Sequence, residues 1–259
     1  MNTSPLRFTS ETVIDGVLER SFLLDDVPGV LWARPRPSAA GAPAPAELVL
    51  MGHGGGLHKR APGLVARART AVLRDGFVVA SLDAPGHGDR PRSAEDQRRV
   101  DAMQRARANA QPIAGIVSEF NASLARRAVP EWQAALDALQ VLPEVDADRP
   151  VGYSGMTLAS EIGIRLAADD ERIGAAVFGG VYASDELLAA ARRVSVPVEV
   201  LLPWDDSELD RESGLAVFHA FASAYKTLQI VPGDHFRVPQ ELVDTRFFAR
   251  HLRAELPVA

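Results

Sequence analysis

The stretch Asp148–Leu166, which reads DRPVGYSGMTLASEIGIRL, decides the fold expected for this chain. Its first half is a short apolar run that favours a β-strand. Its second half carries Leu158, Ile162 and Leu166 at four-residue spacing, which predicts an α-helix. Between the two halves lies a tight turn of small residues. We therefore expect a strand that runs directly into a helix, a turn that can lift one side chain above the edge of a sheet.

Two hydroxyl side chains compete for that turn, Ser154 and Thr157, and neither lies in an unbroken G-x-S-x-G motif. A sharp strand-to-helix turn needs small residues two positions before and after its central residue, because the strand and the helix approach closely there. Gly155 and Ala159 meet this need around Thr157, whereas a turn centred on Ser154 would crowd Met156. The helical spacing also begins directly after Thr157. Sterics favour Thr157, and Ser154 is the alternative.

The bulk composition is that of a soluble globular protein. The chain of 259 residues is 47% apolar, enough for a sizeable core. A net charge of −6 gives no general attraction to nucleic acid or to anionic membranes. The absence of cysteine excludes disulfides and thiolate metal sites. Because no apolar run is long enough for a signal peptide or a membrane span, we expect a cytoplasmic protein.

Apolar runs alternate with helical patterns along most of the chain. Strands are predicted within residues 12–34 and at 47–51, 77–82, 173–178, 197–202 and 227–231, with helices between the later ones. This alternation predicts an α/β fold: a mostly parallel sheet of about eight strands with helices on both faces. The proline- and alanine-rich segment 34–46 is interpreted as a loop, since the segment before it is too short to hold its own core.

One stretch breaks the alternation. Residues 92–129 are rich in arginine and alanine and read as helical without an intervening strand. An excursion placed just before the central strand can grow into a small cap over the edge of a sheet. We therefore expect a single domain, 1–259, with a helical cap-like insertion at 92–129.

Polar residues follow the predicted strands, at the edge where parallel sheets bind ligands. In chain order they are a hydroxyl (Ser154 or Thr157), an acid (Asp205 or Asp206) and His235. This is the order of a nucleophile–acid–histidine triad, in which His235 takes the hydroxyl proton and the acid orients the imidazole. Each residue alone would be an ordinary turn or cap residue, but the three at successive strand ends predict nucleophilic acyl transfer.

A glycine run directly after the strand 47–51, His53-Gly-Gly-Gly56, adds to this prediction. Glycines there let backbone N–H groups approach a ligand closely, as an oxyanion hole requires. The N–H groups of Gly55 and Leu158 are the expected donors, with Gly155 in place of Leu158 if Ser154 is the nucleophile. His53, His87 and Asp89 show no metal-ligand spacing, so no metal site and no cofactor are predicted.

From about Pro28 to Leu252 the chain resembles the α/β-hydrolase superfamily, in particular bacterial dienelactone-hydrolase-like and esterase-like proteins. The motifs that carry the resemblance are Gly52-His-Gly-Gly-Gly56, Asp83-Ala-Pro-Gly-His-Gly-Asp-Arg90, Trp132 with Leu136-Asp-Ala-Leu139, Arg172-Ile-Gly-Ala-Ala-Val177, Leu201-Leu-Pro-Trp-Asp-Asp206, Arg211-Glu-Ser-Gly-Leu215, Lys226-Thr-Leu228 and Pro232-Gly-Asp-His235. The superfamily's acid loop usually reads Asp-x-x-hydrophobic, which implies that Asp206 is the acid and that Asp205 supports it.

The nucleophile turn departs from the pattern of the family. Similar proteins typically read V-G-Y-W-G-L-S-M-G-T where this chain has Val151-Gly-Tyr-Ser-Gly-Met-Thr-Leu-Ala-Ser160. In that alignment the nucleophile falls on Thr157, and Ser154 replaces a strand tryptophan. Threonine nucleophiles act chiefly with an N-terminal amine as base, so three outcomes stay open: a specialised Thr157 nucleophile, a Ser154 nucleophile in a shifted turn, or a lost nucleophile.

The leading functional hypothesis is a hydrolase or acyl-transfer enzyme that acts on an ester, lactone or thioester of a small apolar molecule. The alternatives are a ligand-binding protein that keeps the pocket without covalent chemistry, and a non-hydrolytic lyase or cyclase that uses His235 as a general base. The expected partner is a small-molecule substrate, with no nucleic acid and no membrane. The sequence also allows a homodimer.

Overall fold

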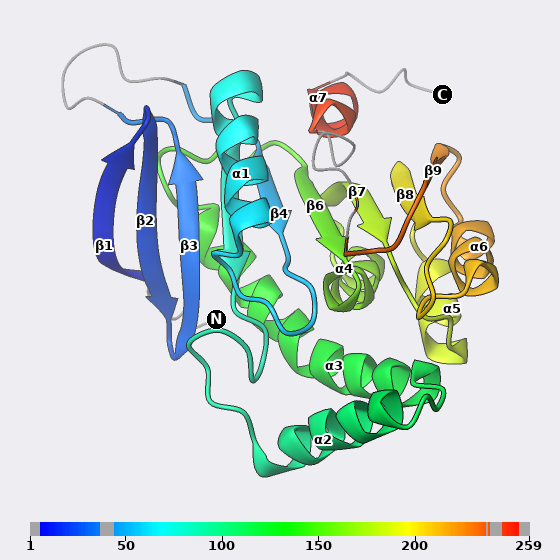
Figure 1. Cartoon of the computed structure of the whole chain (residues 1–259). Helices are drawn as coiled ribbons and strands as arrows, with labels where there is room; N and C mark the ends of the chain where they lie inside the picture. Colours follow the sequence, from blue (N-terminus) through cyan, green and yellow to red (C-terminus); the bar gives the residue numbers. More distant parts are fainter. Residues whose placement is uncertain (1–5, 37–43, 237, 239–244, 254–259) are drawn as a thin grey trace.

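A computed structural model describes residues 6–36, 44–236, 238 and 245–253, and the middle of the predicted loop, 37–43, lies outside them. The described chain forms one nine-stranded sheet in the order β1-β2-β3-β5-β4-β6-β7-β8-β9 (Figure 1). The strands are β1 Leu6–Ile14, β2 Val17–Leu24, β3 Val27–Ala33, β4 Leu48–Met51, β5 Val78–Leu82, β6 Val151–Met156, β7 Ile173–Gly179, β8 Val198–Pro203 and β9 Lys226–Val231. In this order, every neighbouring pair of strands from β5 through β4 and on to β9 is parallel. The predicted mostly parallel sheet is confirmed.

The first three strands form an antiparallel meander that joins the parallel sheet through the β3–β5 pair. Short strand-like runs were predicted within 12–34, in a sheet of about eight strands. With the whole meander, the sheet of the described residues has nine strands. The β1–β2 hairpin turns at Asp15 and Gly16, whose φ angles are 51° and 78°. Two successive left-handed residues are typical of the tight turns that match the twist of a hairpin.

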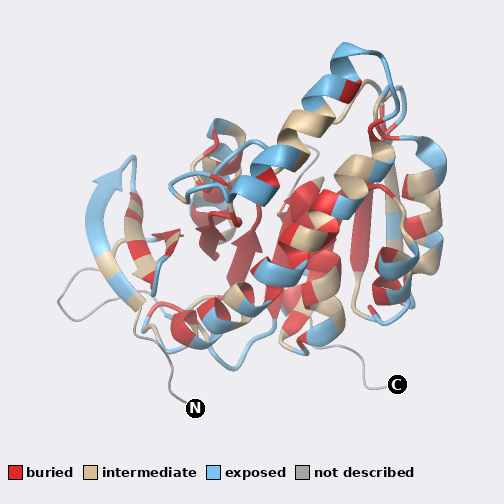
Figure 2. Ribbon diagram, turned by 90° about the horizontal axis from the view of Figure 1, so that it is seen from below, coloured by how far each residue is buried: buried red, intermediate tan, exposed pale blue. Residues whose placement is uncertain are grey.

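Helices cover both faces of the sheet. They are α1 Pro62–Thr70 with its π-helical continuation η1 Ala71–Asp75, α2 Ala94–Ala108, α3 Ala114–Leu139, α4 Leu158–Asp169, α5 Asp185–Ala191, α6 Arg211–Ala220 and α7 Arg246–Arg253. Side chains of α1 and α7 share one core with alternate strand residues such as Val49, while α3 to α6 pack on the opposite face around Phe178. Figure 2 shows the central strands buried between helices whose outer faces are exposed. None of the helices in the described ranges has the length and apolar character needed to cross a bilayer.

Helices α2 and α3 contain most of the residues of the predicted insertion 92–129, and Figure 1 shows α2 beyond the carboxyl ends of the parallel strands. Its role as a cap stays a prediction. Ser93 caps the amino terminus of α2, because its hydroxyl accepts the N–H of Asp96 at 3.1 Å. The sequence predicts a boundary at 129, before a separate helix that contains Trp132. Instead, α3 runs 26 residues without a break and contains Pro130 in its interior. The insertion and the sheet-packed helix therefore share one rigid element.

Candidate active site

Thr157 occupies the sharp turn between β6 and α4. Its φ of 55° and ψ of −116° lie in a region that strains a β-branched residue. The turn is held because the N–H of Thr157 donates to the carbonyl of Gly179 at 2.8 Å. Ser154, in contrast, lies inside β6, is 4% exposed, and pairs in register with Met51 and Val177. Of the two candidate nucleophiles, the structure thus gives the position at the strand-to-helix turn to Thr157.

Close approach of strand and helix explains the small residues around Thr157. A Cβ on Gly155 would lie 2.6 Å from the Cβ of Ala159, far inside van der Waals contact. The hydroxyl of Tyr153 donates to the carbonyl of Ala159 at 2.8 Å and binds the first turn of α4 to the strand. The Ser160 hydroxyl lies 2.8 Å from the carbonyls of Gly155 and Gly179 and accepts the N–H of Gly179 at 2.9 Å. The turn is therefore braced from three sides.

Asp206 and His235 meet at the ends of β8 and β9. The ring Nδ1–H of His235 donates to Oδ2 of Asp206 at 2.6 Å, and the backbone N–H of His235 donates to the same oxygen at 2.6 Å. The other carboxylate oxygen accepts the N–H groups of Glu208 and Leu209, each at 2.9 Å. Burial opposes ionisation of this carboxyl, but the bonds from Leu209, His235 and Glu208 outweigh it and lower the pKa of Asp206. An ionised Asp206 keeps the His235 proton on Nδ1, so Nε2 is left to accept another.

Asp205 lies next to this pair but does not join it. Its side chain is exposed and accepts the N–H of Gly233 at 3.2 Å, while its own N–H donates to the carbonyl of Gly233 at 3.1 Å. These bonds hold the turn that carries His235. The arrangement matches the supporting role that the family resemblance implies for Asp205.

The glycine run after β4 faces Thr157. The segment 54–57 forms a turn closed by a bond from the N–H of Leu57 to the carbonyl of Gly54 at 3.2 Å. A Cβ on Gly54 would lie only 2.9 Å from the Thr157 hydroxyl oxygen, so a side chain there would displace that hydroxyl. The predicted oxyanion donor is Gly55, and no role was predicted for Gly54, although the same glycine run contains both residues. Gly55 lies exposed on the same turn, and its role as an oxyanion donor stays a prediction.

His53 joins the glycine turn to the loop after β5. It is 4% exposed, its Nδ1–H donates to the carbonyl of Gly54 at 2.9 Å, and its Nε2 accepts the N–H of Ala84 at 3.0 Å. Burial lowers the pKa of His53 to about 4. The imidazole is therefore neutral at pH 7, and its two hydrogen bonds connect the glycine turn to the loop after β5.

A buried ion pair secures the same region. The carboxylate of Asp83 is fully buried and accepts the backbone N–H of Lys59 at 2.8 Å, its Nζ at 2.6 Å and the N–H of Asp89 at 2.9 Å. Burial alone would raise the pKa of Asp83, but these bonds from Lys59 and Asp89 lower it. The carboxylates of Asp83 and Asp89 thus hold the loop 83–90 in place through Lys59 and the backbone. In the described part of the chain, no three His, Asp or Glu side chains gather in a way that could hold a metal ion.

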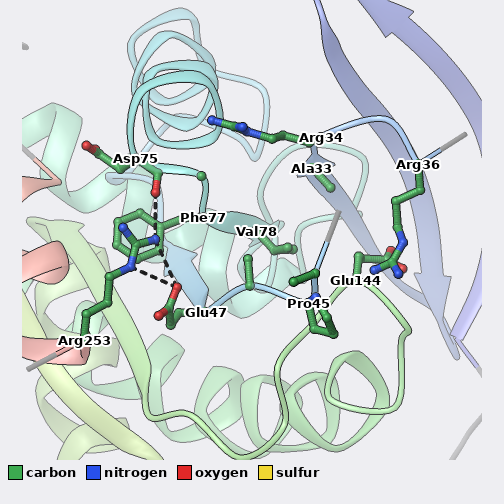
Figure 3. Close-up of a pocket in the computed structure, with 13 residues that line it drawn as sticks. Ala33, Arg34, Arg36, Pro45, Glu47, Asp75, Phe77, Val78, Glu144 and Arg253 are labelled. Carbon is green, nitrogen blue, oxygen red and sulfur yellow. Dashed lines mark hydrogen bonds and ion pairs between the residues drawn. The ribbon is translucent and has the colours of Figure 1, made fainter. Parts of the chain in front are cut away.

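A cavity of about 340 Å³ lies at the other edge of the sheet, by the amino-terminal ends of β4 and β5 (Figure 3). Its charged side chains already have partners within the protein. Arg253 bonds Glu47 and the carbonyl of Asp75, and Arg34 bonds the carbonyls of Val72 and Leu73. Because Thr157 lies at the carboxyl end of β6, this cavity is separate from the candidate active site.

Solved structures with the same architecture extend over nearly the whole chain. A cold-adapted esterase from an Arctic intertidal metagenomic library is 27% identical, with a TM-score of 0.72, over 94% of this chain and 98% of that one. Acetyl xylan esterase 1 from Thermoanaerobacterium sp. is 13% identical, with a TM-score of 0.67, over 95% and 87%. A dienelactone hydrolase from Anabaena variabilis is 18% identical, with a TM-score of 0.58, over 96% and 99%.

The protein has the α/β-hydrolase fold. The resemblance inferred from its motifs is thereby confirmed. No protein-family model and no curated protein matches the chain. The last two structures show only a shared fold at their level of identity, and the Arctic esterase is more similar to this chain in sequence.

Proposed function

We propose that the protein hydrolyses carboxylic esters, lactones or thioesters of small, largely apolar molecules through the triad Thr157, His235 and Asp206. The observation that carries the proposal is the position of Thr157. It is the strained residue at the strand-to-helix turn, with φ of 55°. The loops after β8 and β9 supply a hydrogen-bonded pair, Asp206 and His235. Two structural neighbours with esterase names are consistent with this class of reaction.

In the proposed reaction, Oγ1 of Thr157 attacks the carbonyl carbon of the substrate while Nε2 of His235 takes its proton. The negative charge that develops on the carbonyl oxygen is stabilised by the N–H groups of Gly55 and Leu158. His235 then gives its proton to the leaving alcohol or thiol, and an acyl-Thr157 ester remains. His235 next takes a proton from water, whose oxygen attacks that ester. As the bond between the acyl carbon and Oγ1 breaks, His235 returns the proton to Oγ1 of Thr157 and the carboxylic acid is released. Asp206 stays ionised throughout and stabilises the imidazolium.

Two exposed apolar side chains beside the triad support an apolar substrate. The ring of Phe236 is 73% exposed and lies with its centroid 3.8 Å from that of the His235 imidazole. Leu57 is 49% exposed, and its Cδ1 lies 3.7 Å from the place of a Cβ on Gly54, on the side of Thr157. Exposed apolar side chains beside the histidine and beside the glycine turn are suited to bind an acyl or alcohol chain.

One observation favours a second candidate function, a ligand-binding protein or a non-hydrolytic lyase or cyclase that uses His235 as a base. Within the described residues, no hydrogen bond joins the hydroxyl of Thr157 to His235. The β-branched residue also carries strain of roughly 1–3 kcal/mol at this turn. In that case the wild type would not turn over esters, and Thr157→Ser would create the activity by removing the methyl group.

Turnover of p-nitrophenyl acetate by the wild type and three variants tests the proposal. We expect measurable hydrolysis by the wild type, loss to background in Thr157→Ala and His235→Ala, and retention in Ser154→Ala, whose target lies buried in β6. Labelling by a fluorophosphonate probe should follow the same pattern. Absence of both turnover and labelling in the wild type would overturn the hydrolase. Turnover that survives in Thr157→Ala and disappears in Ser154→Ala would move the nucleophile to Ser154.

A further inference from the structure

Each branch of the Thr157 side chain faces a glycine from a different loop. The hydroxyl lies on the side of Gly54, where a Cβ would be 2.9 Å from Oγ1. The methyl group lies on the side of Gly180, where a Cβ would be 3.2 Å from Cγ2 of Thr157. A serine at this turn would need only the first of these spaces. The second space is therefore specific to the threonine.

Gly180 lies directly after β7, the strand next to the one that leads into the turn. Its φ is 63°, and a Cβ there would also lie 3.1 Å from Cδ1 of Leu209 and 3.6 Å from Cβ of His235. Three groups thus surround the place of the missing Cβ: the Thr157 methyl, a side chain of the acid loop and the base of the triad. Real Cβ atoms rarely have contacts this close, so an alanine at 180 must push at least one of these groups away.

The preceding residue shows the same relation. Gly179 pairs in register with Met156, and a Cβ on Gly179 would lie 2.5 Å from its sulfur and 2.8 Å from the carbonyl of Leu201. Two successive glycines at the end of β7 therefore lie against two successive larger side chains, Met156 and Thr157. Because Gly179 lies against Met156 and Gly180 against Thr157, we infer that these glycines leave room for the side chains of the turn.

We propose that Gly180 is a positioning residue for Thr157. Its missing Cβ leaves the space that holds the threonine methyl, and the occupied space holds Oγ1 on the side of the glycine turn, where the substrate carbonyl is proposed to bind. The kinetic part of this inference rests on the proposed function, while the steric part does not. Crowding at 180 should therefore impair the threonine enzyme and spare a serine enzyme, because serine has no methyl to displace.

A double-mutant cycle over Gly180→Ala and Thr157→Ser tests this. In the threonine background we expect Gly180→Ala to lower kcat about tenfold more than in the serine background, with similar KM ratios in both. The strain of alanine at positive φ is common to both backgrounds and cancels in the cycle. Gly16→Ala is the matched control, since Gly16 has φ of 78° and meets only Leu73 at 3.7 Å, remote from the triad. Its effect should be equal in both backgrounds.

Thermal unfolding of the same four proteins separates this inference from the proposed function. A larger loss of melting temperature for Gly180→Ala in the threonine background supports the steric relation even if none of the proteins hydrolyses an ester. Equal losses in both backgrounds, together with equal kcat ratios wherever turnover is measurable, would overturn the inference. If Gly180→Ala does not fold, Gly180→Asn replaces it in the cycle, because asparagine tolerates positive φ but still carries a Cβ.

Discussion

The replacement Asp206→Asn tests the arrangement of the acid and the histidine. The carboxylate accepts four N–H groups, two on each oxygen, and its side chain is only 1% exposed. An asparagine amide has only one oxygen, so in place of Oδ2 its NH₂ group faces the two N–H donors of His235 and both of those bonds are lost. A shift of the His235 ring proton from Nδ1 to Nε2 lets Nδ1 accept from the NH₂ group and restores one of the two lost bonds. Bonds to a charged acceptor are worth about 1.5–3 kcal/mol each, so the one bond that is not restored costs about 1.5–3 kcal/mol of stability.

The same change acts on the chemistry. An NH₂ group opposite Nδ1 of His235 favours the tautomer that carries its proton on Nε2, which then cannot accept the proton of Thr157. We expect kcat for p-nitrophenyl acetate to fall by roughly 10³–10⁴-fold. The melting temperature should fall by about 3–12 °C for a chain of this size. Stopped assays below the melting temperature of the variant separate the two effects.

Asp205→Asn is the matched control, since it changes the adjacent aspartate, which is exposed and accepts a single N–H from Gly233. Its effect on stability should stay within about 1 kcal/mol, and kcat should change no more than a few-fold. A variant Asp206→Asn that keeps more than a tenth of the wild-type kcat would refute the assignment of the acid. Equal losses in Asp205→Asn and Asp206→Asn would refute it as well.

Two further predictions concern residues that hold the glycine turn and the neighbouring loop in place, His53 and Lys59. Because the pKa of His53 is about 4 in the folded protein, the unfolded chain binds the additional proton first as the pH falls from about 6.5, and unfolding should become easier by up to about 3 kcal/mol towards pH 4. Urea denaturation at pH 7.5 and pH 5 measures this, and His53→Asn should flatten the dependence; an unchanged slope would contradict it. Lys59→Met leaves the buried Asp83 without its cation and should cost about 3–5 kcal/mol. Arg99→Met, which breaks the exposed pair with Glu95, should cost less than about 1 kcal/mol, and equal costs would be contrary to the account.

Much of the fold was predictable because buried parallel strands produce uninterrupted apolar runs, as in Val78–Leu82, where all five residues are buried. The edge strand β1 was missed because it is mostly exposed and shows no alternation of buried and exposed residues. Its turn at Asp15 and Gly16 was the available signal. The continuity of α3 through Pro130 was missed for another reason: proline usually breaks a helix, but Pro130 lies inside this one.

The order of the candidate triad was predictable because the carboxyl ends of parallel strands meet at one edge, which brings residues 157, 206 and 235 together. The turn at Thr157 followed from the small residues Gly155 and Ala159, whose close approach the structure bears out. The relation of Gly54 and Gly180 to Thr157 could not be inferred in this way. It depends on distances between loops more than 20 positions apart, and a glycine in a loop carries no sign of which side chain it faces.

The central claim is that the nucleophile is Thr157 and not Ser154. It is tested most directly by labelling the wild-type protein with a fluorophosphonate and locating the adduct by peptide mass spectrometry with fragmentation between the two residues. The account predicts a phosphonyl group on Thr157, absent from protein denatured before labelling and absent from His235→Ala. An adduct on Ser154, or on neither residue in a protein that hydrolyses p-nitrophenyl acetate, would contradict it.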